Sequence, residues 1–362
     1  MKKLIGGVLA AALLVSPFTQ TTFANELEQD YTDPYYNYYA EDIDGHWAEN
    51  DMKNMLHANI IKGVRDAEDF LYLQPDKSIT RAEFTVLVVR ALELKTDQQG
   101  KAFTDTQKHW AKNDINTANV LGIVSGKSDT EFKPDMKITR AEIAAIVARA
   151  FEATVTFENG TPKTFEDLKP GHWAYNHVRM VNQVGIIKGT SETTVSPDKN
   201  ANRAEATAML KRALWLEDVN LPDQETTMDL VYNSEADTVD AIMERNADSI
   251  YAINDSARYG LGHDMGQMDA EMFEEIFAAD EEVVAELVSE PTLEVVHRST
   301  RFVELNVQDL LIDYYFTDYE TGELDEEPYT EDKSGKYFLI KRNGEWKIYS
   351  SDFYNDFLSF EL

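Results

Sequence analysis

Three arginines stand at matching positions along this chain, each in a setting that could bind an anion. They lie in the segments Thr80-Arg81-Ala82-Glu83, Thr139-Arg140-Ala141-Glu142 and Asn202-Arg203-Ala204-Glu205. Thr or Asn followed three residues later by Glu is the capping-box pattern that begins a helix. The arginine then occupies the first helical position, where the helix dipole disfavours a cation by roughly 0.3–1 kcal/mol. An anion near each arginine would offset this cost.

Two kinds of anion fit this spacing. One is internal, because Asp76, Asp135 and Asp198 each stand five residues before the arginine of their segment. The other is an anionic ligand held jointly by the guanidinium fork and the helix N-terminus. The spacing alone leaves both explanations open.

The elements that position the arginines recur three times. Apolar residues follow each arginine at the same helical offsets, and a tryptophan and a glycine precede it at fixed intervals from each other. Each unit therefore predicts a first helix near the tryptophan that stops at Asn59, Gly122 or Gly185, an apolar turn, a Pro-Asp turn and the capped second helix. Two short helices cannot bury a core alone, so we expect the three units to pack together around their second helices.

This order of motifs resembles the surface-layer-homology (SLH) domain, over about residues 42–218, with repeats at 42–96, 103–155 and 165–218. The resemblance implies an all-α spindle of three helix-loop-helix units with a central three-helix bundle. It also implies non-covalent anchoring of a secreted protein to the Gram-positive cell wall and S-layer, through secondary cell-wall polysaccharide of the pyruvylated N-acetylmannosamine type. The pyruvate ketal would supply a carboxylate for the arginines.

Carried over by position, the resemblance implies twelve ligand-binding residues, four in each repeat. They are Trp47, Lys62, Gly63 and Arg81; Trp110, Ser125, Gly126 and Arg140; and Trp173, Lys188, Gly189 and Arg203. The plainer alternatives are core packing for the tryptophans, tight turns for the glycines and solvent exposure for the lysines. Repeat 2 departs from the pattern with Ser125 in place of Lys, and repeat 3 with Ala201-Asn202 in place of Ile-Thr.

Composition narrows the possible partners. The chain has 362 residues, a net charge of −32 and no cysteine. Such acidity argues against nucleic acid or an anionic membrane as partner, since both would repel it. Residues 1–24 read as a secretory signal, and no later stretch is long or apolar enough to insert into a membrane. We expect residues 25–41 to form an extended linker, and neither a metal nor a cofactor is indicated, because His46, His109 and His172 each stand without a second ligand at helical spacing.

The remaining segment, 222–362, predicts an α+β domain. Residues 228–251 and 269–287 read as acidic amphipathic helices separated by a Gly-rich loop, and β-branched and aromatic residues dominate from Thr292 onward. Asn343-Gly344 predicts a hairpin, so we expect a curved antiparallel sheet. This order is similar to the cone-shaped fold of nuclear transport factor two and its relatives.

No catalytic motif is evident in this domain, so the sequence favours a non-enzymatic, wall-anchored protein that displays it, with other envelope proteins as candidate partners. The alternatives are a wall-anchored enzyme with a cone-shaped catalytic domain and a structural S-layer lattice subunit.

Overall fold

The three capped helices predicted from the Arg-Ala-Glu segments are present in the computed structural model, which describes residues 34–317 and 322–360. They are α4 (Arg81–Ala91), α6 (Arg140–Ala150) and α8 (Arg203–Trp215). In all three, the cap side chain accepts a hydrogen bond from the Glu backbone N–H, and the Glu carboxylate accepts one from the cap backbone N–H. The capping boxes are therefore complete.

The first helix of each unit begins two residues after its tryptophan. These helices are α3 (Glu49–His57), α5 (Lys112–Val120) and α7 (Tyr175–Gln183). They end at the predicted residues, because Asn59, Gly122 and Gly185 have φ values of 53°, 75° and 79°, in the left-handed region. The longer loop of unit 1 forms a small hairpin of β1 (Val64–Arg65) and β2 (Leu71–Tyr72).

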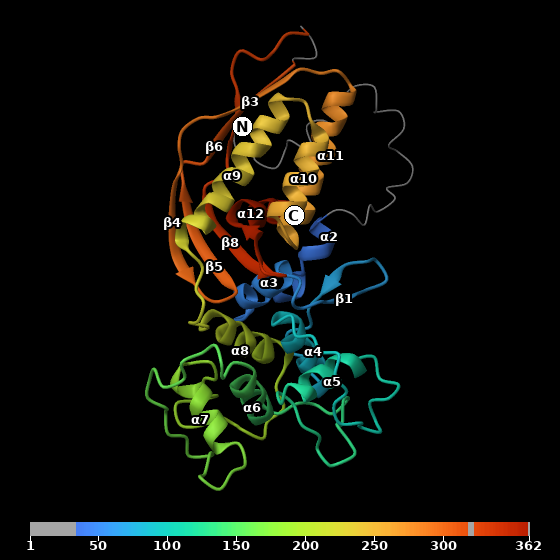
Figure 1. Ribbon diagram of the computed structural model, residues 1–362, viewed down its shortest axis with the longest axis vertical. Coiled ribbons are helices and arrows are strands. Elements are labelled where there is room, and N and C mark those ends of the chain that lie inside the picture. Colours follow the sequence, from blue (N-terminus) through green and yellow to red (C-terminus); the bar gives the residue numbers. More distant parts are fainter. Residues whose placement is uncertain (1–33, 318–321, 361–362) are drawn as a thin grey trace.

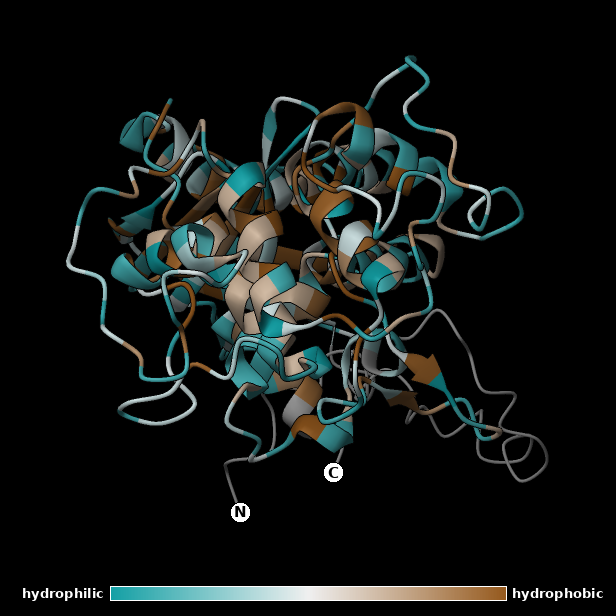
Figure 2. Ribbon diagram, turned by 90° about the horizontal axis from the view of Figure 1, so that it is seen from below, coloured by the Kyte–Doolittle hydropathy of each residue, from teal (hydrophilic) through white to brown (hydrophobic). Residues whose placement is uncertain are grey.

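A closed ring of backbone hydrogen bonds joins the three units. Ile79 N–H donates to Ala201 C=O, Ala201 N–H to Ile138 C=O, and Ile138 N–H back to Ile79 C=O. Each first helix also contacts the second helix of another unit, α5 against α4, α7 against α6 and α3 against α8. One buried apolar cluster runs through all three units, and Figure 2 shows the hydrophilic loops arranged around it. No unit therefore has a core of its own.

The C-terminal half contains more helices than the sequence predicted. Its three long helices are α9 (Gln224–Met243), α10 (Ala247–Ala257) and α11 (Leu261–Ala278). The predicted helices at 228–251 and 269–287 are thus wrong in their bounds, and residues 283–287 form a strand. Because this strand is paired with another along its whole length, long-range pairing decided its conformation over its acidic helical pattern.

Two antiparallel sheets complete the described part of this half. The three-stranded sheet has the order β3 (Val283–Leu287), β6 (Leu311–Phe316), β7 (Tyr329–Asp332). The four-stranded sheet has the order β4 (Thr292–Arg298), β5 (Phe302–Gln308), β8 (Gly335–Arg342), β9 (Glu345–Ser351). The hairpin predicted at Asn343-Gly344 joins β8 to β9, and a helix that the sequence analysis missed, α12 (Asp352–Phe360), follows. The α+β assignment is confirmed.

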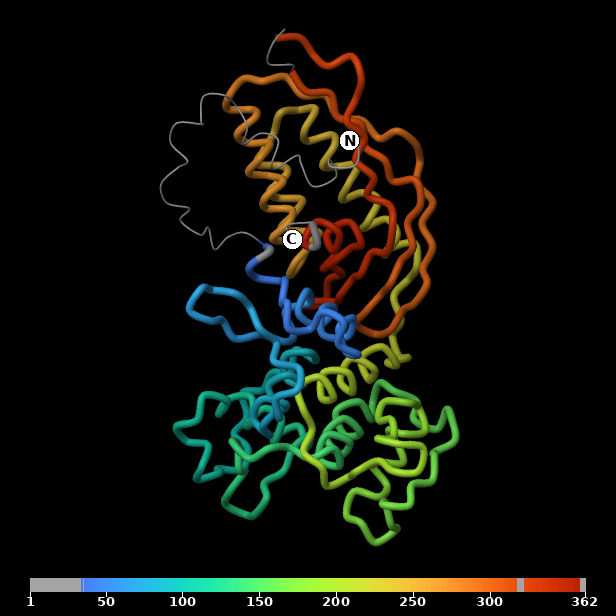
Figure 3. The backbone as a smooth tube through the Cα atoms, turned by 180° about the vertical axis from the view of Figure 1, so that it is seen from behind, coloured from blue at the N-terminus to red at the C-terminus, as the bar shows by residue number. Residues whose placement is uncertain are grey.

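The two halves are packed together through unit 1 and the end of α8 (Figures 1 and 3). The Trp215 ring stacks on Phe302 with centroids 4.5 Å apart, and the Tyr349 hydroxyl donates to the Asn54 side chain. Gly260 begins α11 with φ 59°, and a Cβ there would lie 2.0 Å from the His57 carbonyl oxygen. The apolar cluster of the repeats continues into the C-terminal half, so the halves share a core.

Two of the predictions concern segments before the repeats. Residues 1–33, which include the predicted signal at 1–24, lie outside the described residues. The extended linker predicted up to residue 41 is wrong for its last part, because α2 (Pro34–Tyr38) packs against α3, α11 and α12. Tyr38 and Ala40 are buried there. Within residues 34–317 and 322–360, no helix combines the length and hydropathy needed to cross a bilayer.

Candidate ligand-binding groove between the repeats

Arg81 ties the start of α4 to unit 2. Its Nη1 donates to the Glu142 carboxylate over 2.8 Å, its Nη2 to the Ser125 carbonyl over 2.9 Å and its Nε to the Phe132 carbonyl over 3.0 Å. The residue is 5% exposed. The arginine therefore serves as a buried bridge between units.

Arg140 repeats this arrangement, whereas Arg203 keeps the contacts to carbonyls but is only partly buried and forms no ion pair with a described carboxylate. Arg140 donates to Glu205 over 3.1 Å and to the Lys188 carbonyl over 2.7 Å. Arg203 closes the ring by donating to the Lys62 carbonyl of unit 1 over 2.8 Å. Ser125, Lys188 and Lys62 lie in the apolar turns that follow the first helices, so each arginine binds the apolar turn of another unit.

The aspartates considered as internal partners do not hold the arginines. Asp76, Asp135 and Asp198 are exposed and instead lie 3.3–3.7 Å from the imidazoles of His46, His109 and His172. The hypothesis of an internal anion was right in kind for Arg81 and Arg140, which pair with glutamates, but it named the wrong residues. The start of each helix is hydrogen-bonded to the Pro-Asp turn of another unit, as Arg81 N–H is to Met136 C=O, so the guanidinium reaches across the boundary.

The ionisation of Glu142 decides which charges remain for a ligand. Burial alone would raise the pKa of this carboxyl, but hydrogen bonds from Lys127 and the Thr139 N–H, together with the charge of Arg81, lower it. Glu142 is therefore ionised at neutral pH and balances Arg81. Lys127, whose Nζ lies 2.5 Å from Glu142 Oε1, and Arg149 add two positive charges to the same region.

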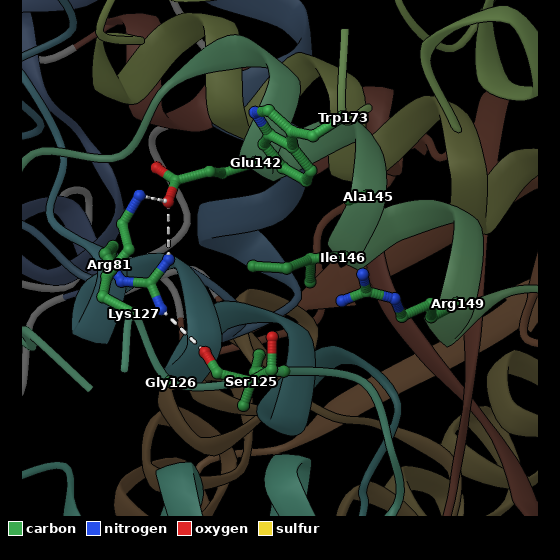
Figure 4. A pocket seen from close by; sticks show the side chains of 10 residues that line it. Arg81, Ser125, Gly126, Lys127, Glu142, Ala145, Ile146, Arg149 and Trp173 are labelled. Carbon is green, nitrogen blue, oxygen red and sulfur yellow. Dashed lines mark hydrogen bonds and ion pairs between the residues drawn. The ribbon is translucent and has the colours of Figure 1, made fainter. Parts of the chain in front are cut away.

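These residues surround a groove of about 220 Å³ to which all three units contribute. Unit 1 provides Arg81, unit 2 provides the turn at Ser125-Gly126 and the α6 face with Arg149, and unit 3 provides Trp173 (Figure 4). The Trp173 residue is 58% exposed. Arg149 donates to the Ile123 carbonyl over 3.3 Å and forms no ion pair with any described residue. The groove thus combines an aromatic face with a guanidinium that no carboxylate occupies.

The same three units match a known family. The S-layer homology domain matches residues 41–85, 102–144 and 164–207. The chain carries three S-layer homology domains.

Relatives of these SLH domains occur in larger proteins. The chain is 32% identical over 210 residues to an amylopullulanase of Thermoanaerobacterium thermosulfurigenes, 33% over 165 residues to a cellulosome-anchoring protein of Acetivibrio thermocellus, and 27% over 206 residues to an S-layer protein of Bacillus licheniformis. These matches cover 57%, 44% and 57% of the chain but only 11%, 36% and 22% of the relatives. The SLH domains identify a secreted protein of the cell surface that is associated with the cell wall.

The structure brings together only part of the predicted site in one groove. Arg81, Ser125, Gly126 and Trp173 line it, whereas Arg140 and Arg203 bond the Lys188 and Lys62 carbonyls at the other two boundaries between the SLH domains. The alternative interpretation that the tryptophans pack in the core is wrong, because Trp47 and Trp110 are 60% and 65% exposed. The exposed position considered for Lys62 and Lys188 is confirmed.

The three SLH glycines are required by their own loops. A Cβ on Gly126 would lie 2.5 Å from the Ser128 carbonyl oxygen, one on Gly63 would lie 2.6 Å from the Tyr72 carbonyl oxygen, and one on Gly189 would lie 2.3 Å from the Ser191 carbonyl oxygen. The tight-turn interpretation of these glycines is therefore confirmed, whatever else they do.

Sequence reasoning missed Arg149, Lys127 and Glu142 as residues of the groove. For Arg149 a signal was present, because an arginine recurs nine residues after each capped arginine. These residues, Arg90, Arg149 and Arg212, donate to the carbonyls of Ile60, Ile123 and Ile186 in equivalent apolar turns. Aligning the SLH domains over their full length would have found the series.

Proposed function

We propose that the SLH domains anchor this protein non-covalently to the cell wall by binding an acidic secondary cell-wall polysaccharide, with the pyruvylated N-acetylmannosamine type as the expected ligand. The C-terminal domain is then held at the surface as a non-enzymatic module. The printed names of the relatives, a cellulosome-anchoring protein and an S-layer protein, support anchoring as the shared role.

The observation that carries the proposal is the pairing of Arg149 with the exposed indole of Trp173 across one groove. A pyruvate ketal carries a carboxylate, which a guanidinium can bind through two parallel hydrogen bonds. The indole offers an apolar face to a sugar ring. Because Glu142 balances Arg81, the charge that attracts the ligand comes from Arg149 and Lys127.

Retention on purified cell walls tests this assignment. The Arg149→Met variant keeps most of the side-chain volume but loses the guanidinium, and we expect at least about tenfold weaker retention. Lys101→Met is the matched control, because Lys101 forms an exposed ion pair with Asp129 over 2.8 Å and does not line the groove. Wild-type retention by Arg149→Met would overturn the groove as the binding site.

The buried charges of the C-terminal domain support a displayed module in preference to an enzyme. Glu235 accepts hydrogen bonds from Arg258 over 2.9 Å and from Lys333 over 3.1 Å, and all three residues are buried. Removing one member of such a buried group would leave an uncompensated charge, so these residues hold one another in place, and their burial encloses them from substrate. Incubating the intact protein with wall glycan and following its chain length tests this, since any shortening would contradict a non-enzymatic role.

A further inference from the structure

A second cleft lies where the SLH domains meet the C-terminal half. Its volume is about 470 Å³, within the range of roughly 300–1,000 Å³ that is usual for small-molecule sites. One wall comes from α3 and α8, and the other from β5, β8, β9 and α12. The cleft therefore exists only when both halves are present, and it is separate from the groove that contains Arg149.

Hydrogen bonds hold the two walls at a fixed separation. The Tyr349 hydroxyl donates to Asn54 Oδ1 over 2.5 Å, and His57 Nδ1 lies 3.1 Å from Ser350 Oγ. Burial lowers the pKa of His57 to about 3, so this side chain is neutral. A ligand would thus meet a preformed cleft, which lowers the entropic cost of binding.

Three lysines from three different elements line this cleft in a protein whose net charge is −32. Lys53 and Lys211 have their closest carboxylates, Glu49 and Asp51, outside the cleft lining. Lys336 is half exposed and pairs with Glu304 over 2.7 Å inside it, and its backbone N–H donates to Asp352, the second carboxylate of the lining. With three lysines against Glu304 and Asp352, and with His57 neutral, the lining carries a net charge of +1, which a generally acidic surface does not predict.

The other lining groups suit a sugar. Asn50 and Asn355 offer amide donors and acceptors, and Phe338 presents a partly buried ring. A side-chain amide can both donate a hydrogen bond to a hydroxyl group and accept one from it, and an aromatic ring packs against the apolar face of a pyranose. We propose that this cleft binds a short anionic saccharide, whose carboxylate or phosphate lies between Lys53, Lys211 and Lys336, and which bridges the SLH domains and the C-terminal domain.

Calorimetric titration of the full chain tests this proposal with three probes. These are digalacturonic acid, N-acetylglucosamine 6-phosphate and neutral chitobiose. We expect saturable binding of an anionic probe, at least about tenfold tighter than chitobiose. The anionic probe that binds more tightly identifies the natural group as carboxylate or phosphate. Absence of saturable binding by both anionic probes, or equal binding of chitobiose, would overturn the proposal.

Variants locate the site within the molecule. The double variant Lys53→Met/Lys336→Met should weaken binding at least about tenfold, whereas Lys336→Arg and Lys101→Met should bind as the wild type does. Loss of binding in Arg149→Met with retention in the double variant would place the probe in the groove and contradict the cleft. If the double variant does not fold, the single variant Lys211→Met replaces it, because Lys211 lines the cleft and not the groove, and wild-type binding by that variant would overturn the proposal.

Discussion

The Arg81 guanidinium lies 2.8 Å from the carboxylate of Glu142, in the capping box of another unit. The Glu142 carboxylate binds two further groups, because it also accepts a hydrogen bond from the Thr139 N–H and forms an ion pair with Lys127. This relationship explains how a cation is tolerated at the start of α4, where the helix dipole opposes it. The Arg-Ala-Glu segment therefore joins neighbouring repeats, and a ligand would bind in the groove beside it.

Replacing Arg81 with Ala should destabilise the protein strongly. The change leaves Glu142 with Lys127 as its remaining cation and removes three hydrogen bonds between units, and a hydrogen bond that involves a charged group contributes about 1.5–3 kcal/mol. Urea unfolding followed by circular dichroism measures the loss, and Arg149→Met serves as a control that we expect to unfold like the wild type. An Arg81→Ala variant of undiminished stability would show that the bridge between units contributes nothing.

His57 should make the protein less stable in mild acid. Burial lowers the pKa of His57 to about 3, whereas an unfolded histidine has a pKa of about 6.5. Between these values the unfolded chain binds a proton that the folded chain does not. The free energy of unfolding should therefore fall as the pH falls through this window, by up to about 1.4 kcal/mol per pH unit.

The variant His57→Asn isolates this contribution. It should flatten the dependence of unfolding free energy on pH between about 6.5 and 5. His177→Asn is the comparison, because burial also lowers the pKa of His177, which is only partly buried, and its effect should be smaller. An unchanged slope in His57→Asn would contradict the assignment of a neutral, buried His57.

Gly260 should be irreplaceable at the contact between the two halves. Its φ is 59°, and a Cβ would lie 2.0 Å from the His57 carbonyl oxygen, so Gly260→Ala must separate α11 from α3. We expect a loss of at least about 3 kcal/mol from strain and displaced packing. Gly45→Ala is the control, since Gly45 has φ 69° but open space around it, and should cost only about 1 kcal/mol. Equal losses in both variants, measured by thermal unfolding, would mean that the contact with α3 is unimportant.

Local patterns predicted the repeats well, and long-range contacts account for what they missed. The capping boxes and the stops at Asn59, Gly122 and Gly185 depend on neighbouring residues, so the sequence contains them directly. The pairing of Arg81 with Glu142 crosses a unit boundary that no local spacing encodes. The conformation of β3 also depends on a distant partner. Its sequence is typical of an acidic helix, but pairing with β6 makes it a strand. The cleft at Lys336 forms only where the two halves of the chain pack together, so no local sequence motif predicts it.

Binding of the intact protein to purified wall polysaccharide, before and after chemical removal of pyruvate, tests the central claim most directly. Calorimetry with the wild type should show binding to the native polymer and at least about tenfold weaker binding to the stripped polymer. Arg149→Met should bind both polymers equally weakly, because its groove lacks the guanidinium that recognises the carboxylate. Equal affinity of the wild type for the native and the stripped polymer would contradict the account.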